Sequence, residues 1–235
     1  MEKKNGKIAP VGHFFAMKIM SKLIFICFIW VLSLSGLSAC QSRDSNSGSP
    51  DGSSVLFQDD FSNPSTGWVQ LHASGGQANY ADGVYQMRTY GANNNVLAVA
   101  GQRFGEARIE VDAIKVPGGR DNRFGLVCRA MDAGNLYVFL ISSDGYYGIG
   151  KIIQNQPMLI GMDSLLPSEK IPQGSGGTHL RADCQGSRLS LYVNGQKIYE
   201  VQDTDLIAGG VGLMVGSYSQ DGTEVLFDNF KVYAP

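Results

Sequence analysis

The chain has 235 residues, enough for one large domain or two small ones. Charged residues make up 17% and hydrophobic residues 43% of it, which excludes a disordered acidic chain and a coiled coil. Thirty glycines without a Gly-X-Y period favour many tight turns, as in an all-β domain. Removing residues 1–39, for the reason given next, takes five Lys from the 19 basic residues and one Glu from the 21 acidic ones. The remaining net charge of about −6 repels a phosphate backbone, so nucleic acid is not an expected partner.

The N-terminal segment has the layout of a secretory signal. Two lysines, the second of them Lys22, precede an uncharged apolar run over 23–37, and small residues follow up to Ala39. Fifteen apolar residues are fewer than the ~20 that a transmembrane helix needs. We therefore predict that residues 1–39 are a signal peptide that is removed.

The end of this segment, Leu37-Ser38-Ala39-Cys40, resembles a bacterial lipobox, in which the cysteine is lipidated and becomes the new N-terminus. The resemblance implies a lipoprotein anchored at the bacterial cell membrane or outer membrane, facing the periplasm or the extracellular side. A soluble secreted protein in which Cys40 is incidental is the alternative. Residues 41–54 contain no apolar residue, which predicts a flexible tether, so the folded domain is expected over 55–235.

The domain is predicted to consist of strands and turns. No window of 55–235 sustains an apolar i, i+3, i+4, i+7 pattern, whereas short β-rich runs recur between glycine-bearing turns. Asn194-Gly195 is the strongest hairpin signal, because a type I′ turn needs positive φ at both central residues. The predicted strands lie near 55–61, 84–90, 95–100, 104–116, 123–131, 136–142, 147–153, 157–161, 178–184, 188–194, 197–202, 210–217 and 224–233.

Alternation along three of these strands predicts a charged surface. Apolar residues alternate with charged residues over 107–113, 123–131 and 180–184. If the three strands belong to one sheet, they display together Glu110, Asp112, Arg129, Arg181 and Asp183.

Several stretches resemble concanavalin A-like, laminin-G-type jelly rolls: DDFSNPSTGW, GLVCRA, LYVNG, GGVGLMVG and VLFDNFKVY. Their order is similar to that of the domain group that includes the 3-keto-disaccharide hydrolase domains of secreted bacterial proteins. The resemblance implies an all-β, two-sheet antiparallel jelly-roll β-sandwich whose concave outer face is often a carbohydrate site. These motifs lie mostly in turns and closing strands, so they indicate the fold better than the function.

Two cysteines remain in the domain, Cys128 and Cys184, both at inward-facing strand positions. An even pair in an oxidising compartment predicts a disulfide. Closing a loop of about 57 residues stabilises a fold by about 4 kcal/mol in the chain-entropy model. Two separate buried thiols that pack as small hydrophobes are the alternative.

Glu110 and Asp112 share a strand face and could serve as general acid and base. Laminarinase-type glycosidases of this fold use Glu-x-Asp followed by a second Glu two or three residues later. Ile114 and Lys115 occupy those positions here, so that mechanism is not expected. The alternative is an exposed strand face whose carboxylates pair with arginines.

Metal and nucleotide chemistry have little support in the sequence. The two histidines of the domain, His72 and His179, lack ligands or nucleophiles at suitable spacing, which argues against zinc and against a Ser-His-Asp triad. No Gly-rich loop leads into a helix, so no nucleotide site is predicted. One structural Ca²⁺ between the first and last strands is an option, with Asp59 or Asp60 and Asp228 or Asn229 as oxygen ligands. Turn capping by the Asp side chains, where the termini pair, is the alternative. No other cofactor is expected.

Aromatic side chains near turns could stack on sugar rings. Tyr137 and Tyr147, with Lys151 as a further donor, complete the predicted carbohydrate site, although tyrosines of a sandwich often simply pack. We therefore predict a non-catalytic module that binds a glycan or cell-envelope polysaccharide. A glycoside-processing enzyme of the keto-sugar type and a structural or adhesive lipoprotein without a small ligand are the alternatives.

Overall fold

The computed structural model describes residues 52–235, which belong to one compact unit. Sixteen strands and no helix occur in this range, and therefore no helix that could cross a membrane is found among these residues. The predicted signal peptide, Cys40 and the predicted tether up to residue 51 lie outside the described residues.

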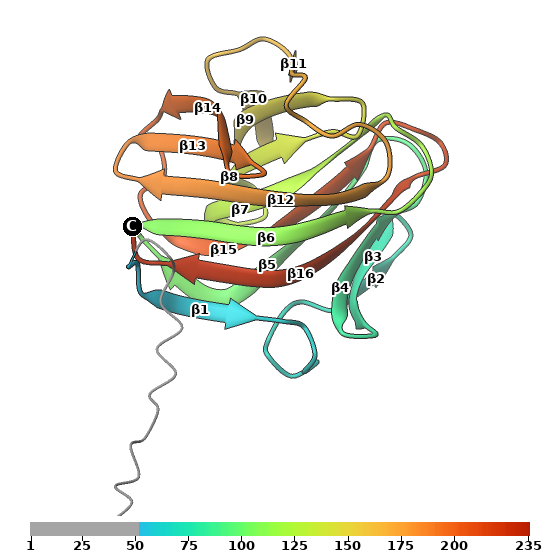
Figure 1. The fold of residues 1–235 in the computed structure, drawn as a ribbon, viewed down its shortest axis with the longest axis horizontal. Coiled ribbons are helices and arrows are strands. Elements are labelled where there is room, and N and C mark those ends of the chain that lie inside the picture. The colour runs from blue at the N-terminus through green and yellow to red at the C-terminus, as the bar shows by residue number, and fades with distance from the viewer. Residues whose placement is uncertain (1–51) are drawn as a thin grey trace, which may run out of the picture. The chain divides into compact units, whose positions relative to one another are not determined.

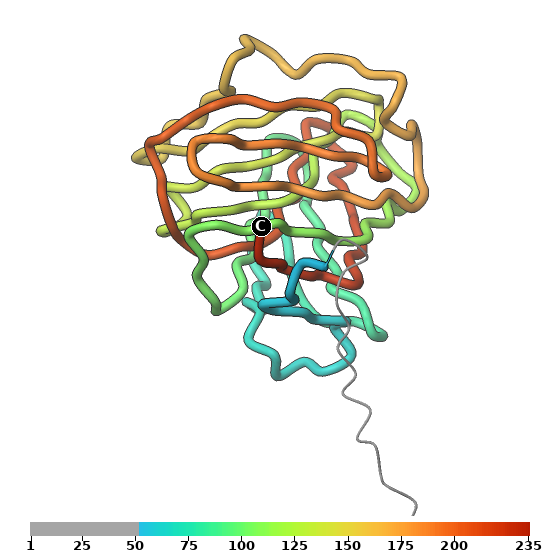
Figure 2. Tube along the Cα trace, turned by 60° about the vertical axis from the view of Figure 1, so that its left-hand side comes forward, coloured from blue at the N-terminus to red at the C-terminus, as the bar shows by residue number. Residues whose placement is uncertain are grey.

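The strands form two antiparallel sheets packed face to face (Figures 1 and 2). The nine-stranded sheet, sheet A, has the order β14-β13-β12-β6-β16-β4-β3-β2, with β1 paired to β16. Its strands are β1 (Val55–Asp59), β2 (Leu71–Ala73), β3 (Gly76–Ala81), β4 (Val84–Thr89), β6 (Ala107–Lys115), β12 (Gly176–Gln185), β13 (Arg188–Val193), β14 (Gln196–Gln202) and β16 (Thr223–Tyr233).

The seven-stranded sheet, sheet B, has the order β10-β9-β8-β7-β15-β5, with β11 paired to β9. Its strands are β5 (Asn94–Phe104), β7 (Asn122–Asp132), β8 (Asn135–Ile141), β9 (Tyr146–Ile153), β10 (Gln156–Leu159), β11 (Leu166–Pro167) and β15 (Gly209–Ser217). The predicted all-β, two-sheet antiparallel sandwich is confirmed.

The core lies between the sheets and follows from the alternation read in the sequence. In β6, Ile109, Val111 and Ala113 are fully buried, while the charged residues between them face outward. Sheet B is apolar on both faces. On its outer face, Val127, Leu136, Val138, Leu140 and Met214 form a second cluster, which explains why its strands read as continuous apolar runs.

The disulfide between Cys128 and Cys184 is present and joins β7 of sheet B to β12 of sheet A across the core, with 6.9 Å between the two Cα atoms. The predicted hairpin at Asn194-Gly195 is also confirmed, with φ of 48° and 78°.

The strands 71–73, 76–81 and 166–167 were not predicted, and the predicted strand 104–116 is divided between β5 and β6. Two of the missed strands read LHA and GQANYA, whose Gln, Asn and Ala have low β-propensity.

A β-bulge in β7 overturns one prediction of the sequence. Arg129 has a φ of 51°, and the pairing of β7 with both of its neighbours shifts at this point. The alternation beyond Cys128 is therefore interrupted, and Arg129 is 2% exposed. In addition, β7 lies in sheet B, whereas β6 and β12 lie in sheet A, so the three strands do not display one common surface.

Candidate functional site

The outer face of sheet A carries a compact charged surface, here called the charged face. Strand register places Arg181 opposite Glu110, Asp183 opposite Arg108, and His179 opposite Asp112. On the other side of β6, Lys231 lies opposite Glu110 and Asp228 lies opposite Asp112. The charged face consists of Arg108, Glu110, Asp112, His179, Arg181, Asp183, Tyr192, Lys197, Asp228, Asn229 and Lys231.

Opposite charges hold one another in place on this face. Arg108 Nε donates to Glu110 Oε1 at 2.7 Å. Arg181 binds Asp183 through two bonds, Nε to Oδ1 at 2.8 Å and Nη2 to Oδ2 at 2.7 Å. The Arg181 guanidinium also lies 4.4 Å from the centre of the Tyr192 ring, within the range of a cation–π contact. These groups are therefore oriented before any ligand arrives.

His179 lies between the two carboxylates of β6. Its Nδ1 is 2.8 Å from Asp112 Oδ1, and its Nε2 is 3.6 Å from Glu110 Oε2. The interaction with Glu110, together with the bond to Asp112, raises the pKa of His179 above its ordinary 6.5, although burial of the ring opposes this shift. Burial alone would raise the pKa of Glu110, but the interactions with His179 and Arg108 outweigh it and lower that pKa. The protonated imidazolium of His179 is thus favoured beside the Glu110 carboxylate.

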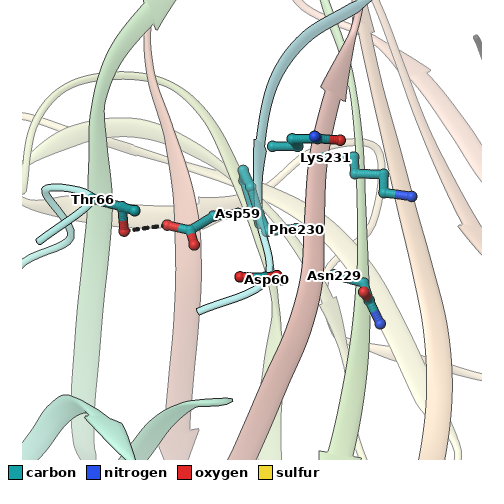
Figure 3. A pocket seen from close by; sticks show the side chains of 7 residues that line it. Asp59, Asp60, Thr66, Asn229, Phe230 and Lys231 are labelled. Carbon is teal, nitrogen blue, oxygen red and sulfur yellow. Dashed lines mark hydrogen bonds between the residues drawn. The ribbon is translucent and has the colours of Figure 1, made fainter. Parts of the chain in front are cut away.

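A polar pocket of about 310 Å³ adjoins the charged face where β1 pairs with β16 (Figure 3). Asp59 is directed toward Thr66, whose hydroxyl donates to its carboxylate, while Asn229 and Lys231 extend from β16 on the other side of the view. Asn229 has a φ of 54° at a bulge of β16, and its Nδ2 donates to Asp112 Oδ2 at 3.0 Å. The bulge thus connects the pocket with the charged face. The pocket is lined by Gln58, Asp59, Asp60, Thr66, Asn229, Phe230 and Lys231.

The residues predicted for a carbohydrate site divide into two groups in the structure. Glu110, Asp112, Arg181 and Asp183 lie together on the charged face, as expected from alternation. Arg129, Tyr137, Tyr147 and Lys151 belong to sheet B and lie elsewhere, so the expectation that all eight share one surface is wrong.

Three of the four sheet B residues support a loop of residues 203–208. Tyr137 is fully buried, and its hydroxyl donates to Asp203 Oδ1 at 2.5 Å. Lys151 Nζ pairs with Asp203 and also with Asp205, at 2.7 Å for the latter. Arg129 donates to the Leu206 carbonyl at 3.0 Å. Arg129 and Tyr137 are buried and Lys151 exposes only 13% of its side chain, so these groups support the loop and are not accessible to a ligand.

Tyr147 has a different neighbour. Its ring centre lies 5.8 Å from that of Tyr199, and the ring packs against the core instead of standing free as a stacking platform. Packing an aromatic ring against the core stabilises the fold more than leaving the ring exposed, so a packed position is the ordinary outcome.

Seven residues of the charged face were not proposed for this site, and three of them contact or lie opposite the predicted ones in an informative way. His179 lies two positions before Arg181, so extending the alternation of β12 by one step would have found it. Tyr192 lies opposite Arg181 in the next strand, which only the pairing of strands reveals. Asn229 reaches Asp112 because of the bulge, for which the sequence has no signal.

The pocket offers few free oxygen ligands for a calcium ion. Asp60 lines the pocket, but its Oδ1 accepts two bonds from Ser62, and Asp228 is not among the lining residues. Both carboxylate oxygens of Asp59 also accept bonds, from Phe61 N and from Thr66. Within residues 52–235 no group of three or more His, Cys, Asp or Glu side chains is arranged to hold a metal ion. Calcium binding at Asp60 and Asp228 stays a prediction.

The chain matches no protein-family model and no curated protein. Among solved structures, it is similar to a carbohydrate-binding module, CBM66, from Bacillus subtilis, at 18% identity and a TM-score of 0.60 over 72% of this chain and 96% of that one. The fold is a concanavalin A-like jelly roll. A β-glucanase of Bacillus licheniformis matches with 13% identity and a TM-score of 0.55 over 76% of this chain and 97% of that one.

A Bacillus subtilis protein of unknown function with a galectin-like fold matches this jelly roll with 14% identity and a TM-score of 0.52. The match covers 76% of this chain and 95% of that one. At such identities the likeness concerns the fold, and the ligand has to be argued from the side chains of the jelly roll itself.

Proposed function

We propose that this protein is a membrane-anchored, non-catalytic carbohydrate-binding lipoprotein whose ligand contacts the charged face and the adjoining pocket. The observation that carries the proposal is the set of paired, pre-oriented donors and acceptors around Asp112, His179 and Arg181. The carbohydrate-binding and glucanase names of proteins with the same fold support it. The lipid anchor rests on the lipobox-like sequence at Cys40.

The charged face suits a ligand rich in hydroxyl groups. Asp112 and His179 expose 47% and 42% of their side chains, and Arg181 exposes 28%, so a ligand can reach them. Each of these groups is fixed by a partner on the same sheet, so binding has to immobilise few additional rotamers. A ligand that lacks matching hydroxyls would leave charged groups desolvated and unpaired, which provides specificity.

Two observations favour binding over hydrolysis. Ile114, with 45% exposure, occupies the place on this face where a second glutamate would stand two residues after Asp112. In addition, the pKa of Glu110 is lowered, with burial opposing the shift and His179 and Arg108 causing it, whereas a general acid needs a raised pKa. A keto-sugar-processing enzyme and an adhesive lipoprotein without a small ligand are the competing functions.

The test is binding of glycans to a soluble chain that begins at Gln41, because residues 52–235 form a compact unit with a core of their own. We expect a glycan array to identify a ligand and calorimetry to show its binding without release of a product. Asp112→Asn and Arg181→Gln should each weaken binding by about tenfold, the equivalent of a lost hydrogen bond to a charged group.

Arg123→Gln is the matched control. Arg123 also lies over a tyrosine, with its guanidinium 4.2 Å from the Tyr218 ring, but it belongs to sheet B. Its replacement should leave the affinity unchanged. Turnover of the ligand would favour the enzyme, and absence of binding to any glycan would favour the adhesive function. Arg129→Ala does not test binding, because this side chain supports the fold.

A further inference from the structure

One end of the sandwich receives the chain from the predicted tether. Val55 at the start of β1 pairs with Tyr233, and Tyr233 pairs with Arg108 of β6. Arg108 follows the turn at Gly105 and Glu106 by two residues. In Figure 1 this end lies on the left, next to the C-terminus, and the turns that follow β5, β7, β12 and β14 lie there as well. We call it the anchor end.

The two most exposed large hydrophobic residues of the described chain lie at the anchor end. Ile207 is 78% exposed and Met131 is 60% exposed. The segments that carry these two residues meet at Gly209. A Cβ atom built at this glycine would lie 2.4 Å from the Arg129 carbonyl carbon and 2.6 Å from the Ala130 backbone, so the chain just after Ile207 packs against the chain just before Met131. The Ile207 carbonyl oxygen lies 3.8 Å from the corresponding position at Gly105. Single exposed hydrophobic residues are common on protein surfaces. Here, however, the two most exposed ones lie at the same end of the sandwich as the start of β1, which follows the predicted tether.

The loop that displays Ile207 is fixed from beneath. The buried Arg129 donates to the carbonyls of Leu206 and Gly105, each at 3.0 Å. The Leu206 amide donates to the Tyr137 hydroxyl at 3.0 Å, and Lys151 pairs with Asp203 and Asp205. The hydrogen bonds of buried Arg129 and Tyr137, together with the ion pairs of Lys151, therefore fix the loop in a conformation that exposes Ile207 to solvent. A surface prepared in this way binds without the entropy cost of ordering a loop.

We propose that the anchor end lies against the lipid bilayer, with Ile207 and Met131 inserted at the level of the headgroups. This inference rests on the proposed lipid anchor at Cys40. The fourteen residues 41–54 predict a tether with a root-mean-square length of about 20 Å. A domain of this size has a radius of gyration of about 16 Å, so the end that receives the tether stays close to the membrane.

Charge favours a neutral lipid surface over an anionic one. The acidic groups of the loop are paired, Asp203 and Asp205 with Lys151, and Glu106 lies 3.4 Å from Arg129. Within the described residues, these ion pairs leave the loop that carries Ile207 with little net charge, which fits zwitterionic headgroups. The charged face runs along the side of the sandwich and stays accessible in this orientation.

The experiment uses the full-length, lipidated protein in phosphatidylcholine vesicles that contain brominated acyl chains, which quench tryptophan fluorescence on contact. Ile207→Trp and Met131→Trp place the reporter at the anchor end, and Leu71→Trp places it on β2, away from this end in Figure 1. The native Trp68 is 4% exposed and gives the same background in all variants. Quenching at positions 207 and 131 should exceed that at position 71 by about twofold, because interfacial residues reach the acyl boundary.

Flotation separates this inference from the anchor on which it rests. Lipidated protein should float with the vesicles and Cys40→Ser should not. If the lipidated protein fails to float, the anchor is wrong. If it floats but Trp at 207 is quenched no more than Trp at 71, the proposed orientation is overturned. Adding Ile207→Asp to Met131→Trp should reduce the quenching at 131, and unchanged quenching there also contradicts the proposal.

Discussion

At the scale of single residues, the pairing of charges decides what the outer face of sheet A can do. His179 turns two neighbouring carboxylates, which would repel each other, into a connected set, and Asn229 holds the second oxygen of Asp112. Neighbouring unpaired carboxylates would raise one pKa, whereas here the pKa of Glu110 is lowered although burial opposes this. The pairing with His179 and Arg108 therefore favours the ionised form of Glu110.

The raised pKa of His179 makes stability depend on pH. The folded protein holds the proton more tightly than the unfolded chain, mainly through Glu110, so the contribution is complete below pH 6.5 and is lost as the pH rises through the folded-state value. We expect the melting temperature of wild type to exceed that of His179→Gln at pH 6, with a difference that shrinks toward pH 8.5. Melting curves over this range measure it, and a constant difference would contradict the assignment.

Arg129 is a charged residue on a strand that nevertheless does not lie on the protein surface. A bulge with positive φ directs its side chain to the carbonyls of Gly105 and Leu206, where it is 2% exposed. A buried guanidinium needs such partners because an unpaired one would be strongly destabilising. The same residue that alternation assigns to a ligand therefore serves the architecture of the anchor end.

At the scale of elements, the β13–β14 hairpin connects local sequence with the charged face. Asn194 and Gly195 adopt positive φ, and the Asn194 side chain accepts a bond from the His179 backbone at 2.9 Å. The turn thus contributes to holding β12 in register beside β13 and fixes the position of His179.

Glycine at position 195 is required by its conformation alone. A Cβ atom there meets no atom within 4 Å, but φ is 78°. We expect Gly195→Ala to reduce the free energy of unfolding by about 1–2 kcal/mol, the cost of the left-handed conformation. Gly177→Ala in β12 is the matched control, because it also has open space and no positive φ in this range. Urea unfolding measures both, and equal effects would show that φ is not the cause.

At the scale of the whole molecule, the disulfide connects the two sheets. Cys128 and Cys184 are separated by 56 residues and are both buried. We expect Cys128→Ala combined with Cys184→Ala to lower the free energy of unfolding by about 4 kcal/mol, because the unfolded chain regains the entropy of an open loop. Urea unfolding of oxidised wild type, reduced wild type and the double variant measures this loss. Reduced wild type should resemble the variant, and a variant as stable as the oxidised protein would contradict the expectation.

The two outer faces of the sandwich differ in polarity and in accessibility. The outer face of sheet A is polar and accessible, whereas that of sheet B is apolar and partly covered by its own chain, since Gly148 leaves room for Leu165. The proposed ligand surface centres on Asp112, His179 and Arg181, whereas the proposed membrane contact centres on Ile207 and Met131. Both can therefore be occupied together.

The sequence by itself determined the fold class, the disulfide pair, the β13–β14 turn and four residues of the charged face. Alternation and turn chemistry are local, so Glu110 and Asp112 could be placed on one face from β6 alone. Only the tertiary structure decided which strands share a sheet and where a bulge interrupts the alternation. Arg129, Tyr137, Tyr147 and Lys151 were therefore misplaced, and Tyr192 and Asn229 were missed. The physical reason is that strand pairing and bulges depend on contacts between residues distant in the chain, which a single strand does not encode.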